Sequence, residues 1–102
     1  MTGLTQDTWQ KINATFANYP LVTEVVLYGS RAKGTYRSGS DIDLTMKGEG
    51  LNLKLLNKIA NDLDDLLLPY SFDLSIFAQI DNHDLIAHIS RVGKVVYRAK
   101  ES

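Results

Sequence analysis

The chain has 102 residues, of which 44% are hydrophobic and 23% charged, so we expect a single domain over residues 1–102 with one core. The net charge of -1 argues against strong nucleic-acid binding, because a general binder needs a basic face to displace counterions from phosphates. The absence of cysteine excludes disulfides, thiolate catalysis and zinc–cysteine sites. The sequence shows no membrane span and no signal-peptide pattern, so we expect a cytoplasmic protein.

The first predicted element is an amphipathic helix over residues 5–19. Its apolar residues Trp9, Ile12 and Phe16 recur at the spacing of one helical face, which indicates a stripe that packs on the core. Pro20 cannot continue a helix and is expected to end it.

A strand, a loop and a second strand follow this helix. The run 22–28 is β-branched and apolar, which favours a strand that stops at Gly29. Residues 30–40 contain further glycines and serines and predict a loop with at most a short helical turn. Residues 41–46 then predict a second strand, which ends in the glycine-containing run 47–50.

The second half of the chain predicts two more helices and one or two strands. Apolar residues at helical spacing indicate a long helix over residues 51–68, and strict alternation over 71–77 indicates a third strand. Asn82 can cap a third helix that ends at Gly93, and residues 95–97 offer a final short strand. The element order predicts an α/β (α+β) domain, in which a small mixed sheet of three to four strands is covered by helices.

The most informative stretch of the sequence is Gly29-Ser30, separated by ten residues from Asp41-Ile42-Asp43. On a strand, side chains two positions apart share a face, so Asp41 and Asp43 should project together. A glycine turn lets the backbone approach phosphate oxygens, and Ser30 adds a hydroxyl to the N–H groups of the turn. A phosphate-binding turn beside paired carboxylates is what a metal-dependent nucleotide site needs. The plainer alternative is that both aspartates face water at a strand end.

Asp73 is a third candidate, because it is a carboxylate in the otherwise apolar third strand. If the second and third strands are neighbours, Asp73 lies beside Asp41 and Asp43, and three such charges repel each other unless a cation neutralises them. Mg²⁺ is the natural cation, and two Mg²⁺ ions can clamp the attacking and leaving oxygens of a phosphoryl transfer. An edge-strand aspartate without a ligand is the alternative interpretation of Asp73.

Three cations, Arg31, Lys33 and Arg37, form a local positive patch around the motif. Arg31 and Lys33 can offset the charge that builds on a pyrophosphate leaving group, although a short helix would direct one of them to solvent. Solvated surface charges are the other interpretation of this patch.

Three further residues near the motif are given structural roles. His83 and His88 are five positions apart, which is the wrong spacing for two ligands on one helical face, so both are interpreted as ordinary helix residues. Tyr28 directly precedes the glycine turn and could touch a bound base, but a buried strand aromatic is the favoured interpretation.

The two-part motif resembles the signature of the DNA polymerase β-like nucleotidyltransferase superfamily. The short chain and the segments Gly-Ser-Arg-Ala-Lys-Gly (29–34) and Ser-Asp-Ile-Asp-Leu (40–44) are similar to its minimal nucleotidyltransferases, the MntA-like antitoxins. The similarity covers about residues 20–78 and implies a polymerase β-like nucleotidyltransferase fold. It implies phosphate binding for Gly29 and Ser30, metal binding for Asp41 and Asp43, and metal binding with activation of the attacking hydroxyl for Asp73.

The resemblance also implies a reaction and a partner. The implied substrates are ATP with Mg²⁺ and a HEPN-type RNase toxin encoded alongside, to whose tyrosine hydroxyl AMP is transferred. A chain of about a hundred residues leaves no room for the domains with which larger relatives bind base and acceptor, which favours an acceptor supplied by another protein. Two alternatives stay open: a non-catalytic antitoxin that masks its toxin, and a nucleotidyltransferase that acts on a small molecule or an RNA end.

Overall fold

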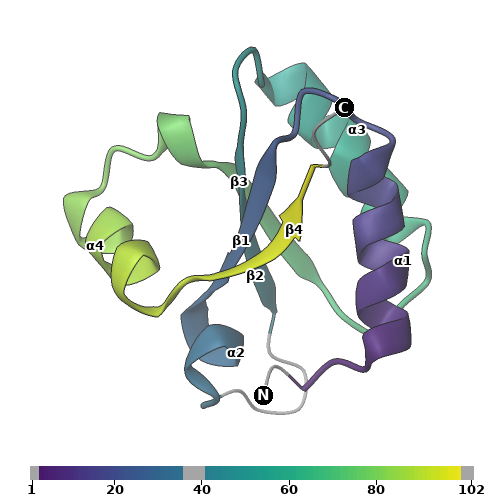
Figure 1. Ribbon diagram of the computed structural model, residues 1–102, viewed down its shortest axis with the longest axis horizontal. Helices are drawn as coiled ribbons and strands as arrows, with labels where there is room; N and C mark the ends of the chain where they lie inside the picture. Colours follow the sequence, from purple (N-terminus) through teal and green to yellow (C-terminus); the bar gives the residue numbers. More distant parts are fainter. Residues whose placement is uncertain (1–2, 36–40, 100–102) are drawn as a thin grey trace.

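Four strands form one mixed sheet in the computed structural model, which describes residues 3–35 and 41–99 (Figure 1). The strands are β1 (Glu24–Tyr28), β2 (Ile42–Lys47), β3 (Phe72–Ile76) and β4 (Lys94–Arg98). Their order across the sheet is β3-β2-β1-β4. β2 and β3 are parallel, whereas β1 runs antiparallel to both of its neighbours. The predicted small mixed sheet is confirmed.

Helices lie on both faces of this sheet (Figure 1). The helical elements are α1 (Gln6–Ala17), α2 (Gly29–Lys33), α3 (Leu53–Asp64), the 3₁₀ turn η1 (Phe77–Gln79) and α4 (His83–Val92). α1 and α3 pack on one face, α4 packs on the other, and α2 follows β1 directly. Within the described ranges, no helix has the length and apolar character needed to cross a membrane.

Capping side chains set where the long helices begin. Thr5 accepts a hydrogen bond from the N–H of Thr8, and Asn82, the predicted cap, accepts from two N–H groups of the first turn of α4. Asn52 caps α3 in the same way, which explains why that helix starts at Leu53 and not at residue 51. α3 ends at Asp64, four residues before the predicted end, because the chain then turns toward β3.

The side chains of β2 alternate between the two faces of the sheet. One set is fully buried against α1 and α3 and consists of Ile42, Leu44 and Met46. On the opposite face, Val26 and Tyr28 of β1 form a second, smaller cluster with Ile89 of α4. Asp43 is the register partner of Tyr28 and lies on this second face. The helix that borders the candidate site is therefore α4.

Candidate active site

Tyr28, Asp43 and Asp73 lie in one row across three neighbouring strands. Tyr28 of β1 is paired with Asp43 of β2, and Asp43 is paired with Asp73 of the parallel strand β3. Paired strands are about 4.8 Å apart, so the two carboxylates are lateral neighbours. Asp41 lies one residue before β2, where the sequence predicted the first residue of the strand. The fold thus brings the three candidate carboxylates to one end of β2.

The surroundings of Asp43 disfavour the ionised form of its carboxyl group. Its side chain is half-buried, whereas Asp41 and Asp73 are exposed. Burial raises the pKa of Asp43 above its ordinary value, and the negative charges of Asp73 and Asp41 raise it further. A cation bound between these groups would reverse both effects, because it would offset the repulsion and replace the lost hydration.

These carboxylates fit Mg²⁺ as a partial set of ligands. Within residues 3–35 and 41–99, no three histidine, cysteine, aspartate or glutamate side chains are close enough together to form a metal site of their own. Mg²⁺ commonly uses one or two carboxylates and takes its other ligands from water and substrate phosphates. Asp43 with a flanking aspartate meets that requirement once a nucleotide supplies the phosphate oxygens.

The turn after β1 requires a glycine at position 29 for two reasons. Gly29 has a φ of +75°, in the left-handed region that other residues rarely adopt. A Cβ at this position would also overlap Oδ2 of Asp43, well inside the 3.0 Å that real Cβ contacts keep. The backbone of the turn therefore lies directly against the Asp43 carboxylate. Ser30 follows in α2 and is half-buried.

The two described cations of the motif differ in environment. Arg31 is 3% exposed, and its guanidinium lies over the ring of Tyr70, 5.0 Å from the centroid. This contact packs α2 against the segment that leads into β3. Lys33 is exposed at the C-terminal end of α2, as expected for one residue of the pair in a short helix. Their contribution to nucleotide binding stays a prediction, and Arg37 lies outside the described residues.

Sequence reasoning missed a role for His88. Its Nε2 accepts a hydrogen bond of 3.2 Å from the N–H of Gly29, although the two residues are 59 positions apart. Tyr28 is 7% exposed, as predicted for a buried strand aromatic, and the His88 ring stands edge-on to it. Burial raises the pKa of Tyr28, a hydrogen bond with Ser75 lowers it, and the charges of Asp73 and Asp43 raise it. The Tyr28 hydroxyl thus faces the carboxylate row.

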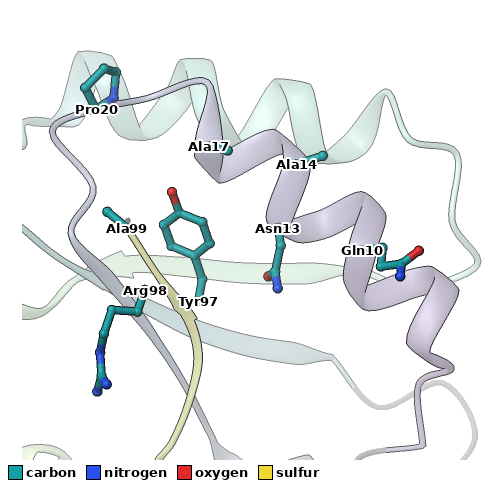
Figure 2. Close-up of a pocket in the computed structure, with 8 residues that line it drawn as sticks. All are labelled: Gln10, Asn13, Ala14, Ala17, Pro20, Tyr97, Arg98 and Ala99. Atoms are coloured by element: carbon teal, nitrogen blue, oxygen red, sulfur yellow. The ribbon is translucent and has the colours of Figure 1, made fainter. Parts of the chain in front are cut away.

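A groove of about 720 Å³ lies elsewhere, between α1 and β4 (Figure 2). The ring of Tyr97 lies between the helix and the strand in this groove, next to Asn13 of α1. This groove is on the α1 side of the sheet, whereas Asp43 lies on the α4 side. It is therefore separate from the carboxylate row and the glycine turn.

Comparison with known proteins identifies a family and a fold. Residues 10–102 match the family model described as "Polymerase beta, Nucleotidyltransferase". A search of curated protein sequences gave no significant match. Among solved structures, a chain of a toxin–antitoxin complex with AMP-PNP has a TM-score of 0.72 at 22% identity, over 95% of this chain and 76% of that chain.

Two more solved structures have the same fold. A chain from a complex of a tri-AMPylated Shewanella oneidensis HEPN toxin with an MNT antitoxin has a TM-score of 0.70 at 20% identity, over 94% of this chain and 74% of that chain. A chain of the toxin–antitoxin pair MntA-HepT has a TM-score of 0.69 at 21% identity, over 93% and 74%. The polymerase β-like fold predicted from the motif is confirmed.

Proposed function

We propose that this chain, which belongs to the polymerase beta nucleotidyltransferase family, is an Mg²⁺-dependent adenylyltransferase and the antitoxin of a HEPN-type toxin. The observation that carries the proposal is the lateral pairing of Asp43 with Asp73 beside the Gly29 turn. A complex of similar fold contains a tri-AMPylated HEPN toxin and an MNT antitoxin, which supports AMP as the transferred group and the toxin as acceptor.

The proposed reaction is attack of a tyrosine hydroxyl on the α-phosphorus of ATP. The new bond joins the tyrosine oxygen to phosphorus, the α–β phosphoanhydride bond breaks, and pyrophosphate leaves. Mg²⁺, held by Asp43 with Asp41 or Asp73 and by the nucleotide phosphates, would stabilise negative charge on the phosphate oxygens and on the departing pyrophosphate. In this proposal Asp73, which is exposed beside Asp43, would accept the proton of the attacking hydroxyl.

The glycine turn supplies binding and orientation in this mechanism. Gly29 lets backbone N–H groups and the Ser30 hydroxyl approach the phosphates without a Cβ in the way. Because the turn lies against Asp43, phosphates held there are next to the metal-binding carboxylates. Positioning of this kind accounts for much of the rate enhancement when two reactants must meet in a defined geometry.

The acceptor hydroxyl is expected to come from another protein. Tyr28 is the tyrosine in register with the carboxylates, but it is 7% exposed and its hydroxyl is hydrogen-bonded to Ser75. A buried side chain whose hydroxyl is already hydrogen-bonded is poorly suited to act as the acceptor. The exposed position of Asp73 leaves space on the outer side of the site for a partner's tyrosine.

Transfer of radiolabel from ATP carrying ³²P on its α-phosphate tests the proposal. The chain is incubated with Mg²⁺, labelled ATP and the HEPN-type protein encoded next to it, if its gene neighbourhood contains one. We expect labelled partner with the wild type and with Asp64→Asn, an exposed carboxylate change on α3, and a loss of at least 10²-fold with Asp43→Asn or Asp73→Asn.

Each other result contradicts a defined part of the proposal. Undiminished labelling by Asp43→Asn and Asp73→Asn would remove the carboxylate row from catalysis. Neutralisation of the toxin by variants that transfer no label would favour the masking antitoxin. Label on RNA ends or on a small molecule, with none on the partner, would assign a different acceptor.

A further inference from the structure

A hydrogen bond joins α4 to the turn that the proposed function places against the nucleotide. Nε2 of His88 accepts it from the N–H of Gly29 over 3.2 Å. A ring nitrogen that accepts a hydrogen bond carries no proton, so Nε2 is the unprotonated ring nitrogen in this contact. The bond ends at the residue where β1 becomes α2, so it connects the helix that covers the second face to the candidate phosphate site.

The His88 ring is held where it can act as a constant acceptor. It stands edge-on to the ring of Tyr28, with centroids 6.3 Å apart and an interplanar angle of 80°, which is a favourable aromatic geometry. Tyr28 is buried, and Ile89, the next residue of α4, is 4% exposed in the same apolar cluster. Packing on both sides of this helical turn limits the positions that Nε2 can take.

Gly29 needs such an anchor more than most residues do. Glycine adopts positive and negative φ with similar ease, so its own chemistry does not fix the φ of +75° seen here. Its Cα lies against the carboxylate of Asp43, and this close approach is free of steric repulsion only because glycine has no Cβ. A hydrogen bond at the N–H of Gly29 removes part of this freedom and keeps the turn beside Asp43.

We propose that His88 is a positioning residue of the nucleotide site, which holds the Gly29 turn in its phosphate-binding conformation. This inference rests on the proposed function of that turn. The turn touches the phosphates in the ground state and in the transition state alike, so loss of its anchor weakens ATP binding and leaves the KM for the acceptor protein unchanged. One neutral hydrogen bond corresponds to roughly five- to tenfold in affinity.

Three variants separate positioning from a purely structural role. His88→Gln keeps an acceptor, because the glutamine Oε1 reaches about as far along the side chain as Nε2 does. His88→Leu keeps the apolar bulk and removes the acceptor. His83→Leu makes the same substitution at the exposed first residue of α4 and is the matched control. The measurements are amide exchange of Gly29 by NMR without ATP, calorimetric Kd for ATP with Mg²⁺, and KM for ATP and partner.

We expect His88→Leu to speed exchange of the Gly29 amide and to raise the Kd and KM for ATP five- to tenfold, while His88→Gln and His83→Leu stay near the wild type. Unchanged exchange in His88→Leu, unchanged ATP affinity, or a loss that His88→Gln does not rescue would each overturn the inference. The exchange and calorimetric data need no transfer activity. A wild-type chain that binds ATP but labels no partner therefore contradicts the proposed function alone.

Discussion

Alanine at position 29 tests whether the close approach of the turn to Asp43 matters for catalysis, and Gly34 provides a matched control. Gly29 and Gly34 have nearly equal positive φ values, +75° and +80°. Alanine in this left-handed conformation costs about 1–2 kcal/mol at either position. The surroundings differ, because no atom of residues 3–35 and 41–99 lies within 4 Å of an added Cβ at Gly34, whereas at Gly29 the added Cβ overlaps Oδ2 of Asp43.

The expected effect of Gly29→Ala on activity follows from how far Asp43 must move. To restore a 3.0 Å contact with the new Cβ, the carboxylate or the turn has to shift by about 1 Å, and a misplacement of that size costs roughly 10²-fold in rate. That factor corresponds to about 2.7 kcal/mol of transition-state stabilisation. Gly34→Ala should stay within about threefold of the wild-type rate, because its cost is confined to the backbone conformation.

The assay is the initial rate of label transfer at saturating ATP and Mg²⁺, with thermal unfolding followed by circular dichroism on the same samples. Both variants should show a lower Tm, by about 4–8 °C for each kcal/mol lost in a domain of this size. Only Gly29→Ala should also show the large fall in rate. Equal rates in the two variants would refute the reasoning, because the left-handed backbone and not the contact with Asp43 would then account for the effect.

Three further predictions concern charge, metal and pH. Burial, followed by the charges of Asp73 and Asp41, raises the pKa of Asp43 in the folded protein above its ordinary value of 3.8. Protonated Asp43 therefore contributes to the free energy of unfolding fully below pH 3.8, and this contribution is lost as pH rises through the folded-state pKa. Asp43→Asn should therefore raise the Tm at pH 7 while it abolishes transfer, and a Tm gain that persists at pH 3 would contradict this cause. Mg²⁺ at a hundredfold excess over its Kd should stabilise the wild type by about 2.7 kcal/mol and raise its Tm accordingly. The Tm of Asp43→Asn should not rise with Mg²⁺, and EDTA should reverse the shift of the wild type. The Tyr19 hydroxyl donates to Asp62, and this hydrogen bond, followed by burial and the Asp62 charge, raises the pKa of Tyr19 to about 12. Tyr19→Phe should lose about 1 kcal/mol at neutral pH, and only the wild type should lose this increment of stability between pH 10 and 12 in chemical unfolding.

Local chemistry was enough to predict the four strands and the three long helices of this fold, whereas the 3₁₀ turn η1 was not predicted. Pro20 and the caps at Thr5 and Asn82 act within a few residues of their own positions, so sequence patterns record them directly. The α3 boundaries were predicted too wide, at 51–68 against Leu53–Asp64. Apolar spacing continues beyond both ends of α3, since the extra leucines pack on the core from outside the helix.

Contacts between distant residues were harder to predict. The spacing of Asp41 and Asp43 is a local signal, but the pairing of Asp43 with Asp73 depends on β2 and β3 being neighbours, which strand alternation alone does not specify. The acceptor role of His88 depends on how α4 docks over β1, and no period in the sequence reports a contact across 59 positions. A histidine in a helix that covers the strand before a glycine turn is the signal that could have raised the question.

One strand, β2, combines fully buried apolar positions with the electrostatically unfavourable position of Asp43. Ile42 and Leu44 are 0% exposed on the α1 and α3 face, and Asp43 between them is pressed against the Gly29 turn on the other face. Burial of two such aliphatic side chains contributes about 3–6 kcal/mol, which offsets the repulsion and desolvation around Asp43. Because the flanking residues are held in the core, the backbone of Asp43 stays beside Asp73 in the sheet, and the repulsion between the two carboxylates persists. A bound cation would offset this repulsion, and the alternation of β2 is thus consistent with the proposed site for metal-bound phosphate.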